Sequence, residues 1–328
     1  MSIISKDISK AVAILNTEEL VAIPTETVYG LAGNIFSKKA IQLIFETKNR
    51  PFFNPLIVHI HSAEQLPEIV RYIPEKAKLL TDAFWPGPLT LVLPKQSTIP
   101  DIITAGKDTV AVRVPNHPMT LALLNRLDFP LAAPSANPFG SISPTTAKHV
   151  NDYFKDAIQM VLDGGPCHRG IESTIIGFKG DDPIIYRLGS TSIEAIEAIV
   201  GPIAIKNTVT EPNQSQKEHA PEAPGMLERH YAPSTVTVLV NDISEELKKH
   251  KNKRIGVLAF HSAIDHDSIA FKIIVSKRKD LLEAASKLYD ALHQLDKQNL
   301  DLIIVERFPN FDLGKTINDR LQRATVQP

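Results

Sequence analysis

The segment LVAIPT at residues 20–25, followed by KKAIQLIFETK at 38–48, decides the fold of the first part of the chain. The first segment is a short apolar run with β-branched residues, which is typical of a buried strand. In the second, Ala40, Ile41 and Ile44 recur at the spacing that places them on one face of a helix. A strand followed closely by an amphipathic helix predicts an α/β fold.

More apolar, β-branched runs follow downstream and predict further strands. They are PLIVHI at 55–60, LTLVLP at 89–94, TVAVRV at 109–114, LAAPS at 131–135, STIIGF at 173–178 and PIIYRL at 183–188. Helical patterns lie between some of these runs, and the spacing is irregular. That arrangement favours a twisted, mixed α/β sheet over a simple doubly wound one.

The last part of the chain has a more regular pattern. Strands are expected at VTVLV (236–240), RIGVLAF (254–260), FKIIV (271–275) and DLIIVERF (301–308), with a strongly amphipathic helix at DLLEAASKLYDALHQL (280–295). This alternation predicts a small Rossmann-like domain. A proline-rich polar stretch precedes it, and 328 residues exceed what one core usually holds. We therefore predict a first domain at 1–203, a linker at 204–233 and a second domain at 234–328.

Composition excludes several classes of protein. The formal net charge is −1, with no polybasic arm, so direct binding of tRNA is left undecided. A lone cysteine, Cys167, cannot form an internal disulfide, which favours a reducing compartment. The N-terminus lacks the apolar run of a secretion signal, and no segment reaches membrane-spanning length. We expect a cytoplasmic protein without a membrane partner.

Two short motifs are set aside. The Gly314-Lys315-Thr316 sequence has Pro309 where a phosphate-binding P-loop needs its first glycine. His59 and His61 could begin a metal site, but no Cys/His cluster at zinc spacing accompanies them. No protein-held metal is predicted.

Two polar segments are better candidates for a site. Lys48 and Arg50 lie at the C-terminal end of the predicted helix. The helix dipole stabilises cations at this end, so we interpret both residues as exposed charges. PSANPFGSISPT at 134–145 follows a strand end, where ligands are often held. Ser143 could cap a following helix, but this explains neither Ser135 nor Asn137.

Taken together, several segments carry a resemblance to a known family. They are PTETVYGL (24–31), KNRPFFNPLIVHI (48–60), WPGPLT (85–90), TVAVRVP (109–115), PSANPFGSISPT (134–145), DGG (163–165) and GIESTI (170–175). In this order they resemble the YrdC-like family. APGMLERHYAP at 223–233 and LGKTINDRLQRA at 313–324 resemble its longer two-domain form.

The resemblance implies a nucleotidyltransferase. Its reaction would combine L-threonine, bicarbonate or CO2 and ATP into threonylcarbamoyl-AMP and pyrophosphate, with Mg²⁺ accompanying the ATP. Downstream threonylcarbamoyl-transfer proteins would use the product to modify tRNA. Charge developing at the α-phosphate calls for fixed cations, so Lys48 and Arg50 are the catalytic candidates.

The resemblance also implies two sets of binding residues, with the linker closing over them. Threonine would be bound by Thr27, His59, Arg113, Ala133 and Ser173. ATP would be bound by Arg50, Asn54, Thr109, Ser135, Asn137, Ser143, Arg187 and Tyr231. The planar fork of Arg113 suits a carboxylate. His59 could act as a base or only orient the substrate, and Glu26 could simply stiffen its turn.

Two other functions remain open. The same cations could belong to an RNA-binding module without turnover, which ATP to pyrophosphate exchange would distinguish. A sugar-phosphate lyase such as dihydroxybutanone-phosphate synthase shares a similar twisted sheet. That activity would need an acidic metal cluster, and the sequence does not show one at matching positions.

Overall fold

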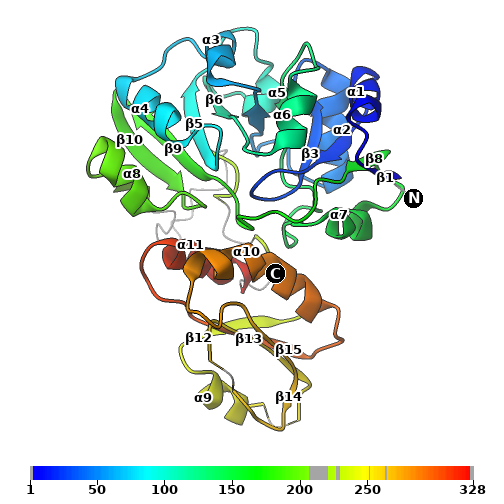
Figure 1. Cartoon of the computed structure of the whole chain (residues 1–328), viewed down its shortest axis with the longest axis vertical. Coiled ribbons are helices and arrows are strands. Elements are labelled where there is room, and N and C mark those ends of the chain that lie inside the picture. The colour runs from blue at the N-terminus through cyan, green and yellow to red at the C-terminus, as the bar shows by residue number, and fades with distance from the viewer. Residues whose placement is uncertain (1–2, 207–220, 227–229, 251, 263, 326–328) are drawn as a thin grey trace.

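The computed structural model describes residues 3–206, 221–226, 230–250, 252–262 and 264–325 of the chain. They form a large domain, drawn in blue to green in Figure 1, and a smaller domain drawn in yellow to red. The remaining residues, including much of the predicted linker, lie outside the described part. Within the described part, no helix is both long and apolar enough to cross a membrane.

The first domain is built on one mixed sheet of eleven strands. The strands are β1 (Ile3–Ser5), β2 (Val21–Ile23), β3 (Gly30–Asn34), β4 (Ile57–His59), β5 (Leu89–Pro94), β6 (Thr109–Arg113), β7 (Leu131–Ala132), β8 (Met160–Leu162), β9 (Thr174–Lys179), β10 (Asp182–Arg187) and β11 (Ala204–Ile205). Their order is β1-β8-β2-β3-β7-β4-β6-β5-β9-β10-β11. Parallel and antiparallel pairs both occur, as in β4 with β6 and β5 with β6. The predicted twisted mixed sheet is therefore confirmed.

Helices connect and cover these strands. They are α1 (Ile8–Asn16), α2 (Lys38–Lys48), the 3-10 turn η1 (Ala63–Gln65), α3 (Leu66–Ile69), α4 (Glu75–Phe84), α5 (Asp101–Thr104), α6 (Pro118–Leu124), α7 (Ala147–Phe154) and α8 (Ile193–Val200). Ser37 caps the start of α2, where its hydroxyl accepts a hydrogen bond from the Ala40 amide, and Asn49 caps the end in the left-handed conformation. These two caps explain where α2 starts and stops.

The second domain is a parallel sheet covered by helices. It contains β12 (Thr237–Val240), α9 (Ile243–Lys248), β13 (Ile255–Ala259), β14 (Ile269–Ile274), α10 (Leu281–Asp296), β15 (Leu302–Glu306) and α11 (Leu313–Ala324), with strand order β12-β15-β13-β14. Alternate residues of β15 face opposite sides of the sheet. Ile303 and Val305 pack with α10 and α11, whereas Leu302 and Ile304 pack with α9. This arrangement agrees with the predicted Rossmann-like domain.

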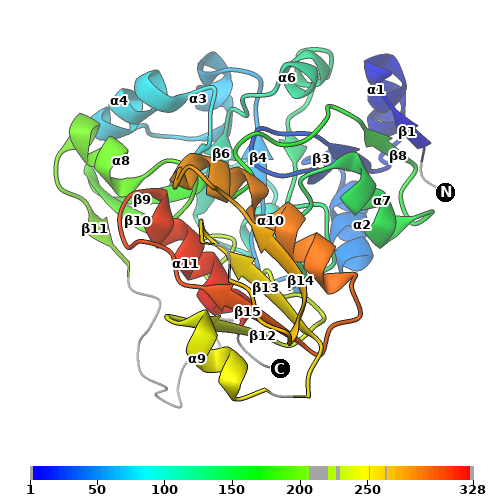
Figure 2. The same cartoon turned by 60° about the horizontal axis from the view of Figure 1, so that its bottom comes forward.

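Helices α10 and α11 also form the surface that packs on the first domain (Figures 1 and 2). Val28, Ile142 and Ile171 from the first domain share one apolar cluster with residues of both helices, including Leu288 and Ile317. The core of the small domain therefore continues across the interface. Because the buried side chains interlock, the two domains hold a defined relative position in this structure.

The structure contains strands that were not predicted from the sequence, including β1 and β8 at one edge of the sheet. Strand β3 was not predicted, because GLAGN contains two glycines and little β-branched character, yet it is buried between β2 and β7. Ala204 and Ile205 were assigned to the linker but form β11, which pairs with β10 at the sheet edge. The sheet thus continues two residues past the predicted boundary.

Candidate functional site

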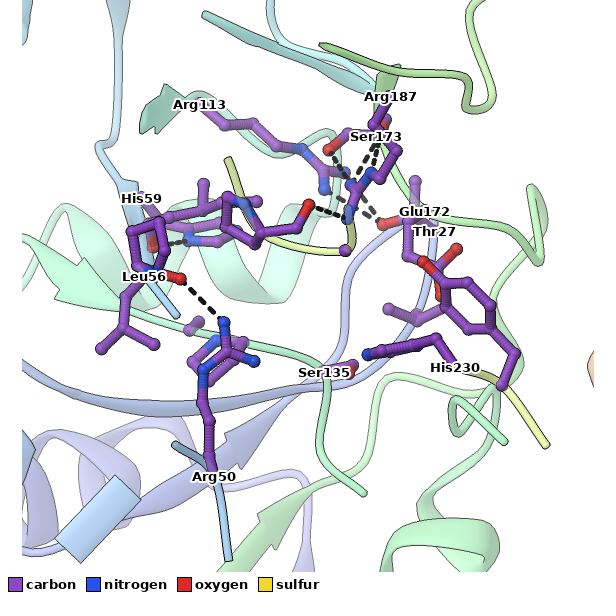
Figure 3. Close-up of a pocket in the computed structure, with 18 residues that line it drawn as sticks. Thr27, Arg50, Leu56, His59, Arg113, Ser135, Glu172, Ser173, Arg187 and His230 are labelled. Atoms are coloured by element: carbon purple, nitrogen blue, oxygen red, sulfur yellow. Dashed lines mark hydrogen bonds between the residues drawn. The ribbon is translucent and has the colours of Figure 1, made fainter. Parts of the chain in front are cut away.

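A pocket lies in the first domain beneath the interface with the second, and Figure 3 shows it in close-up. It is lined by Thr27, Val28, Arg50, Pro55, Leu56, Ile57, His59, Arg113, Ala133, Pro134, Ser135, Glu172, Ser173, Arg187, Pro224, Gly225, His230 and Tyr231. These residues come from strand ends and loops far apart in the sequence. Arg113 and Arg187 enter from one side and Arg50 from the opposite side (Figure 3).

The PTETVYGL segment forms a tight turn that presents Thr27 to the pocket. The Thr25 hydroxyl donates to the Val28 carbonyl at 2.6 Å and accepts a hydrogen bond from the Thr27 amide at 3.1 Å. Tyr29 then ties this turn to the DGG segment, because its hydroxyl donates to the Gly165 carbonyl at 2.7 Å. Side-chain bonds to nearby backbone of this kind hold a turn in one conformation.

Arg113, at the end of β6, is buried and paired with an acid. Its Nη2 lies 2.6 Å from Glu26 Oε1, both of its terminal nitrogens lie 3.1 Å from the Thr27 hydroxyl, and Nε donates to the Gly87 carbonyl at 3.1 Å. Glu26 therefore does more than stiffen its turn, since its carboxylate holds the guanidinium. The pair adds no net charge to this end of the pocket.

His59, on neighbouring β4, is a neutral side chain. Burial, with the nearby Arg113 charge, lowers its pKa to about 3. Its Nδ1 lies 3.1 Å from the Ile57 carbonyl, which can only accept, so Nδ1 carries the proton. The other ring nitrogen, Nε2, is left as an acceptor. With so low a pKa, His59 is better suited to orient a donor than to take up a proton at neutral pH.

Arg50 and Arg187 differ from Arg113, because in the described part of the chain neither forms an ion pair. Arg50 donates to the carbonyls of Asn54 and Pro55, at 3.2 and 2.7 Å. Arg187 donates to the Ser173 carbonyl at 2.7 Å and hydroxyl at 3.2 Å. Burial, and for Arg50 the nearby Arg187, lowers both pKa values, that of Arg50 to about 9. Buried cations without an acid partner are costly unless a ligand supplies the anion.

The prediction that Lys48 and Arg50 are exposed helix-end charges is wrong. Lys48 is 1% exposed and Arg50 is 7% exposed. The Lys48 ammonium donates to the Ser135 carbonyl at 2.5 Å and to the Asn137 carbonyl. Burial, with the charge of Arg50, lowers the pKa of Lys48 well below its usual value. The helix end is covered by the loop after β7, so the cation holds that loop beside the pocket.

Nine residues of the predicted binding sets line this pocket, and the others lie around it. The lining members are Thr27, Arg50, His59, Arg113, Ala133, Ser135, Ser173, Arg187 and Tyr231, whereas Lys48, Asn54, Thr109, Asn137 and Ser143 lie outside the lining. Thr109 is on the same face of β6 as Arg113 but at the other end of the strand. Ser143 donates to Glu172 at 2.7 Å, and the Asn137 amide donates to the Pro138 and Ser141 carbonyls.

Asn54 is distinct among these surrounding residues. It is fully buried, and neither polar atom of its side chain has a hydrogen-bond partner in the described structure. Buried amide groups normally find partners, so an unpartnered side chain at this position is unusual. The roles assigned to these five residues stay predictions.

The linker contributes a wall of the pocket. Tyr231 is 1% exposed, and its hydroxyl lies buried with no partner in the described part of the chain. Gly225 has a positive φ of 77°, and a Cβ there would lie 2.8 Å from Arg187, so a glycine is needed for the linker to approach so closely. The predicted closure by residues 204–233 stays a prediction, and residues 207–220 and 227–229 lie outside the described residues.

Sequence reasoning did not select Glu172 or His230, although both lie in segments that carried the resemblance. Glu172 lines the pocket from GIESTI and His230 from APGMLERHYAP. Burial lowers the pKa of His230 to about 3, with Arg50, Lys48 and Arg187 acting the same way and Glu172 opposing them. The presence of charged or titratable residues in otherwise apolar segments was the signal that could have identified them.

Fold and site define a class: two-domain α/β proteins with a buried, arginine-rich pocket suited to small anionic ligands. Residues 13–189 match a family model described as telomere recombination, the Sua5/YciO/YrdC model. Residues 191–326 match one described as the C-terminal domain of threonylcarbamoyl-AMP synthase. The chain therefore belongs to the Sua5/YciO/YrdC family, in the form that carries this second domain.

Individual relatives are similar to this chain in sequence over nearly its full length. A threonylcarbamoyl-AMP synthase of Bacillus subtilis is 40% identical, covering 97% of this chain and 92% of the relative. One of Schizosaccharomyces pombe is 36% identical, covering 94% and 85%. The crystal structure of Pyrococcus abyssi Sua5 complexed with L-threonine superposes with a TM-score of 0.90 at 37% identity, covering 99% of this chain and 97% of the other.

Proposed function

We propose that this protein makes threonylcarbamoyl-AMP and pyrophosphate from L-threonine, bicarbonate or CO2 and ATP. The observation that carries the proposal is the charge arrangement of the pocket: Arg113 is paired with an acid, whereas Arg50 on the opposite side and Arg187 beside Arg113 have no acid partner in the described structure. The names and the threonine complex of the relatives support it. The enzyme is thus a nucleotidyltransferase in this proposal.

At the paired end, threonine would bind as a zwitterion. The Arg113 fork would bind its carboxylate, and Nε2 of neutral His59 would accept a hydrogen bond from its amine or hydroxyl. Thr27 and Ser173 add hydroxyl groups, and Ala133 leaves space beside them. The balanced Arg113–Glu26 pair suits a ligand whose own charges cancel.

The unpaired cations, Arg50 and Arg187, would bind the triphosphate. Threonine carbamoylated at its amine attacks the α-phosphate, and pyrophosphate leaves with the electron pair of the broken bond. Negative charge grows on the oxygens around phosphorus during this step, so Arg50 and Arg187 would stabilise it by donating hydrogen bonds to those oxygens. Lys48 would act mainly by holding Ser135 and Asn137 in place, since its ammonium is bonded to their carbonyls.

Mg²⁺ enters this proposal with the nucleotide. Among the residues that the structure describes, no group of three or more His, Cys, Asp or Glu side chains could hold a metal. Glu172 faces the pocket, but its two oxygens already accept from Ser143, Tyr289 and Arg320. The ion would therefore bind to phosphate oxygens and water and offset their charge. A cytoplasmic location, and delivery of the product to tRNA-modifying proteins, belong to the same proposal.

The direct test is a product assay with purified protein. With ATP, threonine and bicarbonate together, we expect pyrophosphate release and a product of the mass of threonylcarbamoyl-AMP. Omission of any one substrate should abolish that product. Pyrophosphate release that does not depend on threonine would contradict the proposal.

The RNA-binding alternative has less support in the structure. The three pocket arginines are buried, so a polynucleotide backbone would not reach them without a large opening. The product assay also distinguishes this alternative, because a binding module would retain RNA on a filter without forming pyrophosphate.

A further inference from the structure

The second domain reaches the pocket through one buried carboxylate. Glu172 lines the pocket, and its Oε1 accepts from the Ser143 hydroxyl at 2.7 Å. Its Oε2 accepts from Tyr289 of α10 at 2.9 Å and from Arg320 Nε of α11 at 2.8 Å. Two of its three partners therefore come from the second domain.

Arg320 is placed for this contact by several interactions. It is only 1% exposed and is among the largest fully buried side chains in the described structure. Its Nη2 donates to the Leu188 carbonyl and its Nη1 to Asp319, each at 2.5 Å. The guanidinium carbon also lies 4.9 Å from the ring centre of Tyr231, which itself lines the pocket. One side chain thus contacts Glu172 and the aromatic wall together.

Electrostatics gives this arrangement a consequence for the reaction. Glu172 is a negative charge in the wall of a pocket proposed to bind a polyanion. Arg187 lies close by, since it donates to the carbonyl of Ser173, the next residue in the chain. Without Arg320, the buried carboxylate would attract Arg187 and would repel the nucleotide phosphates. With Arg320 in place, Glu172 has its own cation.

We propose that Arg320 is a positioning residue that neutralises Glu172 and so leaves Arg187 available to ATP. This inference rests on the proposed nucleotide site. It gives the second domain a defined task, which is to complete the charge balance of a pocket that lies in the first.

The titration of Glu172 supports this assignment. Burial alone would raise its pKa, but Arg320, Arg187 and the Ser143 hydroxyl outweigh burial and lower the pKa to about 2. The groups facing it are Ser143, Arg187, His230, Tyr231, Tyr289 and Arg320. Loss of Arg320 would let burial raise the pKa, so that acid could then discharge the carboxylate.

The test measures binding of a nonhydrolysable ATP analogue by calorimetry at pH 8. For Arg320→Gln we expect about tenfold weaker binding or more, the scale of losing one partner of a buried charge pair. The Arg320→Lys variant should lose less affinity for the analogue, because lysine keeps the positive charge. The double variant Glu172→Gln/Arg320→Gln should recover most of the affinity, because it removes both charges. Between pH 8 and 6, Arg320→Gln should regain affinity that the unmodified protein does not gain.

Lys315→Gln is the matched control. It removes the ion pair between Lys315 of α11 and Glu194 of α8, which joins the same two domains at the surface, and it should not change ATP affinity. An Arg320→Gln variant with normal affinity overturns the inference. So does a folded double variant without recovery, or an equal loss in Lys315→Gln.

Two further outcomes are separable. If Arg320→Gln does not fold, the double variant decides the question, because it contains no unpaired carboxylate at this position. If the unmodified protein itself does not bind the analogue, the proposed function fails, and not only the role of Arg320.

Discussion

The two ends of the pocket both contain arginine, but the arginines differ in charge balance. At the threonine end, Arg113 lies 2.6 Å from Glu26. Arg50 at the opposite end and Arg187, which enters beside Arg113, donate to backbone carbonyls and have no acid partner in the described structure. Arg113 is therefore electrically balanced, whereas Arg50 and Arg187, proposed to bind the nucleotide, carry excess positive charge.

The difference teaches how one pocket can select two unlike substrates. A zwitterion gains little from a strongly charged surface but needs donors and acceptors in fixed places. A triphosphate gains most from uncompensated cations. The presence or absence of an acid beside an arginine, rather than the arginine itself, sets the ligand class. Five predictions test this comparison, from the largest expected effect to the smallest.

Acid should destabilise the fold through three buried histidines, two that line the pocket and one on α10. Burial is the main cause that lowers the pKa of His59, His230 and His293 to about 3. Below pH 6.5 the unfolded chain binds protons that the folded chain does not. Stability is therefore fully present above pH 6.5 and falls as pH drops towards 3, by up to about 1.4 kcal/mol per pH unit for each histidine. Urea unfolding from pH 8 to 5 measures this loss.

Removal of one histidine should reduce the slope below pH 6.5. His59→Asn tests the threonine end and His230→Asn the nucleotide end. A variant whose stability falls as steeply as that of the unmodified protein would show that the replaced histidine is not held neutral.

Arg50→Met should weaken ATP binding far more than threonine binding. The change removes charge-assisted hydrogen bonds to phosphate, each of which contributes about 1.5–3 kcal/mol, so roughly a tenfold to hundredfold rise in the ATP dissociation constant is expected. Calorimetry with each ligand separately measures both affinities. An equal loss for threonine would mean that the two ends are not electrically distinct.

Arg113→Lys should have the opposite selectivity. Lysine keeps the charge beside Glu26 but cannot also contact Thr27 and a ligand carboxylate with a planar fork. We expect about a tenfold rise in the threonine dissociation constant and little change for ATP. Unchanged threonine affinity would contradict the assigned role, and threonine methyl ester serves as a ligand control because it lacks the free carboxylate.

Tyr231→Phe should weaken ATP binding without lowering the stability of the fold. The hydroxyl is buried with no partner in the described part of the structure, so its removal should leave the melting temperature unchanged or slightly raise it. If the hydroxyl binds nucleotide, ATP affinity should fall about two- to tenfold, the range of one neutral hydrogen bond. A lower melting temperature with normal ATP affinity would make the hydroxyl purely structural.

Lys39→Ala should have the smallest effect. Lys39 lies 2.7 Å from Glu19, but the lysine side chain is 53% exposed. Water screens an exposed ion pair, so denaturation should show little change and both substrate affinities should stay the same. A large effect on either affinity would mean that a charge outside the pocket lining influences binding, which would weaken the two-end comparison.

Much of the architecture was accessible from the sequence because it follows from local patterning. The apolar periodicity of residues 38–48 predicted α2, and the apolar run at 89–94 predicted β5 with its observed bounds. Strand β3 was missed because its burial depends on β2 and β7, not on its own composition. Sequence resemblance likewise selected most of the pocket residues, since they lie in recognisable segments.

Charge pairing could not be predicted in this way. The motif PTET contains Glu26, but its bond to Arg113 joins residues that are 87 positions apart, and only the packed sheet places them together. From the sequence, Lys48 was predicted to be an exposed cation at a helix end, but in the structure the loop after β7 covers it. The contacts of Glu172 with α10 and α11 depend on how two domains dock.

The sequence by itself therefore determined the elements, the two-domain order and the family, because hydrophobic periodicity and motif identity are properties of neighbouring residues. The tertiary structure alone decided which arginines are paired, which histidines are neutral, and which carboxylate the second domain holds. Those properties depend on burial and on distances of a few ångströms between remote residues, since desolvation and Coulomb energy act through space and not along the chain.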